Sequence, residues 1–100
     1  MNKYTIKLLP KVYRDLDEIY EYISSTLLVS ETAINTIEAI EDAIFSLEEL
    51  PYRGSERKTG VYAYQGYRQL FVKNFTIIYR IDEAKKYVVI VTIKYSMNNF

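Results

Sequence analysis

The sequence predicts a two-layer α+β domain in the order β-α-α-β-β-β, with an antiparallel helical hairpin packed on a twisted, mainly antiparallel sheet. Three observations predict this fold. A short alternating segment at residues 4–8 precedes two apolar stripes with helical spacing, at 11–25 and 30–50. Runs rich in β-branched and aromatic residues follow at 67–72, 75–81 and 87–93. Because neither amphipathic helix can bury its stripe alone, the strands must supply the second layer.

The first predicted strand and the first predicted helix meet at Pro10. Residues 4–8 alternate as in a strand, and Pro10 ends it because proline lacks the N–H that a ladder needs. A helix is then expected over about residues 11–25. Its apolar stripe consists of Val12, Leu16, Ile19, Tyr20 and Ile23. Its acidic residues are expected on the flanks and the opposite face: Asp15, Asp17, Glu18 and Glu21.

A second stripe predicts a helix that begins near Ser30 and ends at or just after Leu50, where Pro51 stops it. The stripe consists of Ala33, Ile37, Ile40, Ile44 and Leu47, and Ile34 and Phe45 broaden it. The short apolar connection at 26–29 makes the two helices an antiparallel hairpin.

A β-hairpin that turns at Lys73-Asn74 is the element around which the chain is expected to be organised. Its second strand places Tyr79 on the face that we expect to be core. Residues 87–93 are apolar on both faces and are predicted as a central strand. Residues 52–66 hold all three glycines and predict a long loop. That loop is either a basic, aromatic surface suited to nucleic acid or a tyrosine-rich flap packed on the sheet edge.

Composition excludes several kinds of chemistry. The chain has no cysteine and no histidine, so disulfides, thiolate ligands and imidazole ligands are all absent, and neither a metal nor a cofactor is expected. No apolar run approaches the roughly 18 residues of a membrane span, and the N-terminus does not read as a signal peptide. We therefore expect one cytoplasmic domain, residues 1–100, without a membrane segment.

The formal net charge of zero conceals an asymmetry between the two halves of the chain. Residues 1–50 carry 4 Lys/Arg and 10 Asp/Glu, whereas residues 51–100 carry 9 and 3. Either the second half meets an anionic partner, or the helices carry acids on solvated faces while the strands carry the bases.

Along nearly its whole length, the chain resembles the RelE/ParE superfamily of toxins from type II toxin–antitoxin systems. The matching segments are residues 15–23, Leu47–Pro51 with Arg53-Gly54, Gly66–Leu70, Phe75–Ile81 and Val88–Ile93. The resemblance implies a growth-inhibiting toxin that is held silent by a cognate, co-encoded antitoxin. ParE-like members inhibit DNA gyrase, whereas RelE-like members cut mRNA on the ribosome.

The sequence favours the ParE-like branch. The run Phe75–Arg80 looks closer to the ParE pattern, in which an apolar run ends in Tyr-Arg, and Thr76 stands where the nucleases often have Arg. In the alternative, a metal-independent endoribonuclease, the catalytic candidates are Arg68, Lys94 and Tyr95. The candidates for binding nucleic acid or another target are Arg53, Arg57, Lys58, Arg68 and Arg80. A third possibility is an inactive scaffold that binds the antitoxin.

The expected partners are the antitoxin and either DNA gyrase or the ribosome with its mRNA. An open strand edge would offer the antitoxin a place to dock by strand addition. The predicted packing, and with it the toxin assignment, further requires Arg68 and Lys94 to lie near each other on the sheet.

Overall fold

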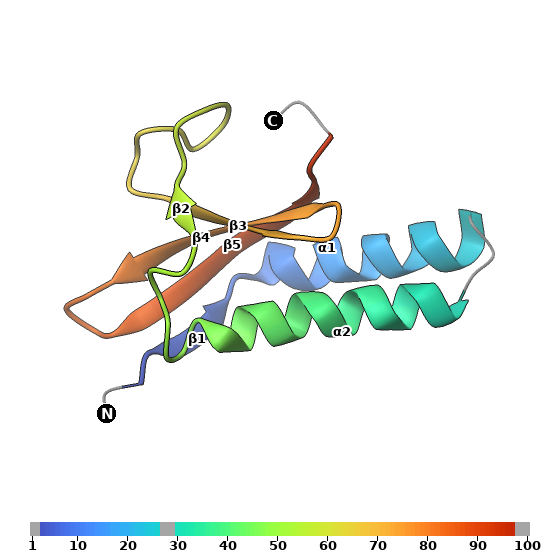
Figure 1. Ribbon diagram of the computed structural model, residues 1–100, viewed down its shortest axis with the longest axis horizontal. Helices are drawn as coiled ribbons and strands as arrows, with labels where there is room; N and C mark the ends of the chain where they lie inside the picture. Colours follow the sequence, from blue (N-terminus) through green and yellow to red (C-terminus); the bar gives the residue numbers. More distant parts are fainter. Residues whose placement is uncertain (1–2, 27–29, 98–100) are drawn as a thin grey trace.

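The computed structural model describes residues 3–26 and 30–97. Its elements are β1 (Thr5–Leu8), α1 (Pro10–Glu21), the π-helix η1 (Tyr22–Thr26), α2 (Ser30–Ser46), β2 (Ser55–Glu56), β3 (Arg68–Val72), β4 (Phe75–Asp82) and β5 (Tyr87–Tyr95). The two helices lie side by side on one face of the sheet, which confirms the predicted two-layer α+β architecture (Figure 1). The connection at 27–29 lies outside the described residues.

The strands form one sheet in the order β1-β5-β4-β3-β2. Only β1 and β5 pair in parallel, so the sheet is mainly antiparallel, and β5 lies inside it as predicted. The short strand β2 was not predicted. It lies within the segment expected to be a loop and pairs with β3 through Ser55 and Glu56.

The β3–β4 hairpin turns at Lys73 and Asn74, as predicted. Lys73 has a φ of 53°, in the left-handed region that tight hairpin turns use. The β4–β5 pairing contains a β-bulge, because Ile78 pairs with Thr92 while the next residue, Tyr79, pairs with Ile90. The extra residue in β5 reverses the alternation of faces, so that both Ile90 and Ile93 enter the core.

The core lies between the helices and the sheet. Its fully buried members include Val12, Ile40, Leu47, Ile77, Tyr79, Val88 and Ile90. Tyr79 is completely buried, as predicted. The apolar stripes are narrower than predicted, because Tyr20, Ile34 and Phe45 are exposed. A single sheet covers only one side of each helix, and these three side chains lie beyond its reach.

The second helix also ends earlier than predicted, at Ser46 rather than near Leu50. Residues 47–49 form a turn instead. The backbone N–H of Tyr4 donates to the carbonyl of Glu48 at 2.8 Å, so this turn is tied to the segment that leads into β1. The helix therefore ends well before Pro51, at a turn whose backbone is hydrogen-bonded to the segment that leads into β1.

The face of the sheet away from the helices is covered at its middle, whereas Phe71 and Arg80 on the same face are exposed. Thr76, Ile78 and Thr92 on this face are at most 1% exposed. Residues 57–66, which we call the flap, lie on this side of the sheet (Figure 1). Arg57 of the flap is buried, whereas residues 58–61 and 64–66 are exposed, so the flap meets the sheet at its base and presents Tyr64 to solvent.

Candidate functional site

The three residues predicted to be catalytic do not share a face of the sheet. Arg68 pairs with Tyr79 and therefore lies on the helix side, whereas Lys94 pairs with Thr76 on the flap side. Tyr95, the next residue, returns to the helix side. The expectation that Arg68 and Lys94 lie close together was wrong, because their partners on β4 are three residues apart and the face changes at every residue.

Arg68 anchors the segment that leads into β2. Its Nη2 donates to the carbonyl oxygen of Gly54 and, at 3.3 Å, to that of Tyr52. The guanidinium also lies 5.2 Å from the centre of the Tyr52 ring. Its Nε is the one buried side-chain nitrogen or oxygen in residues 3–26 and 30–97 that makes no hydrogen bond. These contacts give Arg68 a structural role toward the loop backbone.

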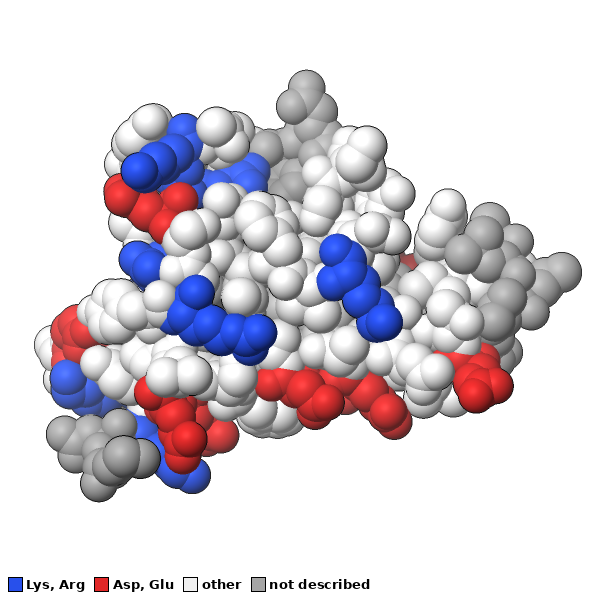
Figure 2. Space-filling model, viewed as in Figure 1, with Lys and Arg blue, Asp and Glu red and all other residues white. Residues whose placement is uncertain are grey.

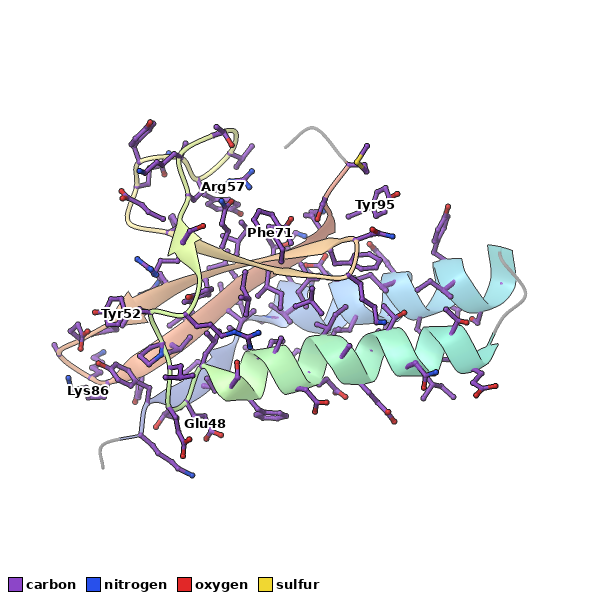
Figure 3. The ribbon with its side chains drawn as sticks, viewed as in Figure 1. Glu48, Tyr52, Arg57, Phe71, Lys86 and Tyr95 are labelled. Atoms are coloured by element: carbon purple, nitrogen blue, oxygen red, sulfur yellow. The ribbon has the colours of Figure 1, made fainter. Side chains whose placement is uncertain are left out.

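The other basic candidates are distributed over several elements. Arg57 is only 6% exposed, and its guanidinium donates to the Val61 carbonyl at 3.2 Å and to Gln69 Oε1 at 2.9 Å. It therefore lies beneath the flap and fastens it to β3 (Figure 3). Arg53 donates to Ser46 Oγ at the end of α2. Lys58 and Arg80 are exposed, on the flap and on β4 respectively.

One buried carboxylate, that of Asp15, was not predicted from the sequence. Asp15 is 4% exposed, although it was expected on a flank or the outer face of its helix. One oxygen accepts a hydrogen bond from Lys11 Nζ at 2.8 Å. The other accepts from Thr92 Oγ1 at 2.6 Å and from the N–H of Ile93 at 3.0 Å. Its spacing from Val12 and Ile19, three and four residues, places Asp15 within the apolar stripe and was the available signal.

Asp15 supplies an acceptor at the edge of β5, because β1 covers only part of that strand. The β1–β5 pairing ends at Ile90, so the N–H of Ile93 has no strand partner on that side. An unpaired N–H buried away from water would be costly, and the carboxylate supplies the missing acceptor. A charged side chain placed at this edge also prevents another strand from pairing there.

The titration of this cluster follows from its contacts. Burial alone would raise the pKa of Asp15, but the hydrogen bonds from Lys11, Thr92 and Ile93 lower it. Burial would lower the pKa of Lys11, but its hydrogen bond to Asp15 and the charge of that carboxylate raise it. The pKa of Lys94 is lowered, first by the neighbouring Lys11 and then by burial.

A groove of about 700 Å³ opens beside this cluster. Its walls come from α1, η1, the start of α2, the β3–β4 turn and the end of β5: Asp15, Glu18, Ile19, Tyr22, Ile23, Thr32, Thr36, Lys73, Asn74, Phe75, Ile93, Lys94 and Tyr95. We call it the helix–strand groove. The end of α1 and the start of α2 project beyond the β3–β4 turn, which leaves their inner surfaces uncovered by strands (Figure 1). The groove combines an apolar wall with charges of both signs, as sites for polypeptide segments do.

The charge asymmetry of the sequence is visible on the surface. On the face shown in Figure 2, acidic side chains gather along the edge of the helical layer, and basic side chains lie mainly toward the strands and the flap. Within residues 3–26 and 30–97 there is no group of three or more acidic side chains that could hold a metal ion.

The opposite end of the sheet carries a cluster centred on Glu83. Its carboxylate accepts hydrogen bonds from the hydroxyls of Tyr52 and Tyr4, the latter at 2.7 Å, and from Lys86 at 2.9 Å. Tyr52 and Lys86 lie at this end, far from Tyr95 at the other (Figure 3). These bonds, that of Tyr52 first, lower the pKa of Glu83 to about 2. The cluster ties the β4–β5 turn to β1 and to the loop after α2.

A helical hairpin covering one face of a mixed five-stranded sheet is the fold of solved RelE/ParE superfamily toxins, and the family match identifies the chain as one of them, although Arg68 and Lys94 lie apart. The chain belongs to the ParE toxin family within it. The family model, described as the ParE toxin of the type II toxin–antitoxin system parDE, matches residues 6–100. No curated protein sequence matches the chain.

Solved structures of low sequence identity share the fold. A chain of the chromosomal ParDE toxin–antitoxin system from P. aeruginosa is 24% identical, with a TM-score of 0.76 and coverage of 95% of this chain and 98% of that one. A chain of the RelBE2 toxin–antitoxin complex from Mycobacterium tuberculosis is 21% identical, with a TM-score of 0.66 and coverage of 93% and 98%. The YoeB/ParE toxin from Agrobacterium tumefaciens is 18% identical, with a TM-score of 0.61 and coverage of 91% and 96%.

Within residues 3–26 and 30–97, no helix is both long enough and apolar enough to cross a membrane.

Proposed function

We propose that this ParE-family toxin acts by binding DNA gyrase, without cleaving RNA, and that a co-encoded antitoxin neutralises it. The separation of Arg68 from Lys94 carries the choice between the two activities. Metal-free cleavage of RNA requires basic groups and a general acid or base within hydrogen-bond reach of one phosphate. Lys94 and Tyr95 line the same groove, but Arg68 lies on the other face of the sheet from Lys94, with its partner on β4 three residues from that of Lys94, so the two cations do not converge on one phosphate.

The covered middle of the flap side of the sheet supports the same choice. Thr76, Ile78 and Thr92 are almost fully buried there, and Arg57 fastens the flap to β3. A nuclease that displays its basic groups on the sheet needs that face open to RNA. The exposed Lys58 and Arg80 are instead available as rim contacts for a protein partner.

The test measures both activities in parallel. Purified toxin is added to gyrase in a DNA supercoiling assay, and mRNA 5′ ends are mapped in cells soon after the toxin is induced. We expect supercoiling to be inhibited while mRNA stays intact. Codon-linked cleavage of mRNA with normal supercoiling would reject the gyrase proposal and favour the RelE-like ribonuclease.

A charge-removal variant tests the surface that contacts the target. Arg80→Ala removes an exposed charge from the flap side of β4, and Lys85→Ala removes one from the β4–β5 turn as a matched control. We expect Arg80→Ala to weaken inhibition of supercoiling about fivefold, which corresponds to roughly 1 kcal/mol at an interface. Equal inhibition by both variants would exclude Arg80 from the contact surface.

The helix–strand groove is the surface that we propose for the antitoxin. Its apolar wall is formed by Ile19, Ile23, Phe75 and Ile93 and is suited to an amphipathic segment. Two of the solved structures that share the fold are described as parts of toxin–antitoxin assemblies. Because Asp15 occupies the N–H of Ile93, we place the antitoxin in the groove rather than in strand addition to this part of β5.

Two exposed residues on the helices allow a matched test of antitoxin docking. Tyr22 lines the groove and is 58% exposed, whereas Ile34 is 47% exposed and does not line it. Because both are already exposed, replacing either with Glu should leave the fold intact. We expect Tyr22→Glu to weaken antitoxin binding by about tenfold or more while toxicity is retained, and Ile34→Glu to bind normally. Unchanged binding by Tyr22→Glu would refute the assignment of the groove.

A further inference from the structure

The two walls of the helix–strand groove carry charges of opposite sign. The wall formed by α1, η1 and α2 includes Glu18, and the wall formed by the β3–β4 turn and the end of β5 includes Lys73 and Lys94. Figure 1 shows the β3–β4 turn on the strand side of this end of the molecule and the helices on the other. A segment bound in the groove therefore meets an acidic side chain on one flank and basic side chains on the other.

The fourth charged residue of the groove is already neutralised. Asp15 is 4% exposed and forms an ion pair with Lys11 at 2.8 Å. By contrast, Glu18 and Lys73 are exposed, and neither side chain forms a hydrogen bond or an ion pair within the part of the chain that the structure describes. The charges of Glu18 and Lys73 are therefore available to a partner.

The apolar part of the groove determines how a partner lies between these charges. It consists of four side chains, each at most 9% exposed: Ile19, Ile23, Phe75 and Ile93. A helix that sets its apolar stripe on these side chains presents a polar flank on either side of the stripe. One flank then lies beside Glu18, and the other lies beside Lys73 and Lys94.

We propose that the groove recognises an antitoxin helix with one basic flank, which faces Glu18, and one acidic flank, which faces Lys73 and Lys94. This inference rests on the proposed function, which places the antitoxin in the groove. Exposed charges at the edge of an interface steer association and suppress wrong partners more than they add affinity. Glu18 and Lys73 are thus specificity-determining residues, whereas the apolar part of the groove supplies most of the binding energy.

The two walls discriminate between partners in a way that net charge cannot. A helix with two basic flanks is repelled by Lys73 and Lys94, and a helix with two acidic flanks is repelled by Glu18. Only a helix with one flank of each sign satisfies both walls. The toxin would therefore reject antitoxin helices that fit the apolar part of the groove but carry the wrong charges.

Single charge reversals on the two walls test this pattern. Full-length toxin carrying Glu18→Lys or Lys73→Glu is measured against the purified co-encoded antitoxin by surface plasmon resonance at low salt. Each variant should bind about fivefold more weakly or worse, mainly through slower association. The controls Asp17→Lys and Lys85→Glu make the same charge changes at exposed positions that do not line the groove, and they should bind normally. Normal binding by both groove variants would refute the pattern.

A double variant separates the pattern of charges from the net charge. Glu18→Lys/Lys73→Glu exchanges the charges at these two positions and keeps the net charge of the wild-type toxin. It should bind more weakly than either single variant, and the loss should shrink at high salt because salt screens exposed charges. Wild-type affinity of the double variant would overturn the proposal, since net charge alone would then explain the single variants.

The Tyr22→Glu variant distinguishes failure of this inference from failure of the docking site. Normal antitoxin binding by Tyr22→Glu would reject the docking site and, with it, the charge pattern. Weakened binding by Tyr22→Glu together with normal binding by Glu18→Lys and Lys73→Glu would refute the charge pattern alone. Circular dichroism confirms that each variant is folded before its binding is compared.

Discussion

Replacing Asp15 with alanine should destabilise the fold by about 3 kcal/mol, a large fraction of the stability of a domain of this size. The carboxylate is 4% exposed and accepts from Thr92, Ile93 and Lys11. Removing it leaves the hydroxyl of Thr92 and the N–H of Ile93 without their acceptor. It also leaves the Lys11 ammonium without its carboxylate, beside Lys94.

The magnitude follows from these three contacts. A hydrogen bond from a buried donor to an ionised acceptor contributes about 1.5 kcal/mol at the lower end of its range, so the bonds from Thr92 and Ile93 together account for about 3 kcal/mol. The side chain of Lys11 is 41% exposed, so solvent screens its ion pair and we assign it about 0.5 kcal/mol or less. For a domain of about 100 residues, the total lowers Tm by about 12–24 °C.

Urea unfolding followed by circular dichroism measures this loss. Asp17→Ala is the control, because Asp17 is exposed on the same helix and its replacement gives the same gain in helix propensity. The difference between the two variants thus isolates the buried contacts. A difference below about 1 kcal/mol would show that Asp15 does not hold α1 to the sheet as reasoned here.

The pH dependence supplies a second check on Asp15. Its pKa in the folded protein lies below the ordinary value of 3.8, so the ionised form stabilises the fold. That contribution is fully present above about pH 5 and is lost as the pH falls through the lower, folded-state pKa. The gap in stability between wild type and Asp15→Ala should therefore be constant from pH 5 to 8 and narrow below pH 4.

Three other substitutions give separate tests of the fold. Tyr79→Phe removes a hydroxyl that donates to the Pro51 carbonyl at 2.8 Å and accepts from the Gly54 N–H at 3.0 Å. It should lower the free energy of unfolding in urea by about 1–3 kcal/mol. The control Tyr13→Phe, at an exposed position, should lower it by about 0.5 kcal/mol or less. Gly54→Ala would place its Cβ 2.3 Å from a backbone oxygen of β3, and should lower stability by about 1–3 kcal/mol, which a calorimetric Tm would detect. The Glu83 carboxyl should titrate by NMR near pH 2 rather than 4.5, so its stabilising contribution is lost between those values as pH falls. Tyr52→Phe should move that midpoint upward, and an unchanged midpoint would contradict the hydrogen bond between them.

The layered architecture was predictable because the apolar residues repeat with the period of a strand in some segments and of a helix in others. Alternation over the strands and the 3.6-residue stripes on the helices each mark a buried face. The turn at Lys73-Asn74 and the burial of Tyr79 followed from the same patterns. These features depend on residues close together in sequence, so local patterns suffice to predict them.

The site depended on relations that local patterns do not contain. Whether Arg68 and Lys94 share a face depends on the register of three strands, because each is placed by its partner on β4, Tyr79 for Arg68 and Thr76 for Lys94. Likewise, the burial of Asp15 depends on where the pairing between β1 and β5 ends. That pairing ends at Ile90, which is more than seventy residues from Asp15 in the sequence. A two-residue strand such as β2 is too short to show any alternation.

The contacts of Asp15 also constrain how a partner can use the groove. Because the carboxylate occupies the N–H of Ile93, a partner cannot extend the sheet there through backbone hydrogen bonds without displacing a buried charge. Under the proposed function, recognition in the groove must therefore come from side chains, among them Tyr22 and Lys94. Side-chain recognition discriminates between partners, whereas backbone pairing is largely independent of sequence. An antitoxin docked in this way would be specific to its own toxin, and the matched Tyr22→Glu and Ile34→Glu variants measure how much of that specificity the groove supplies.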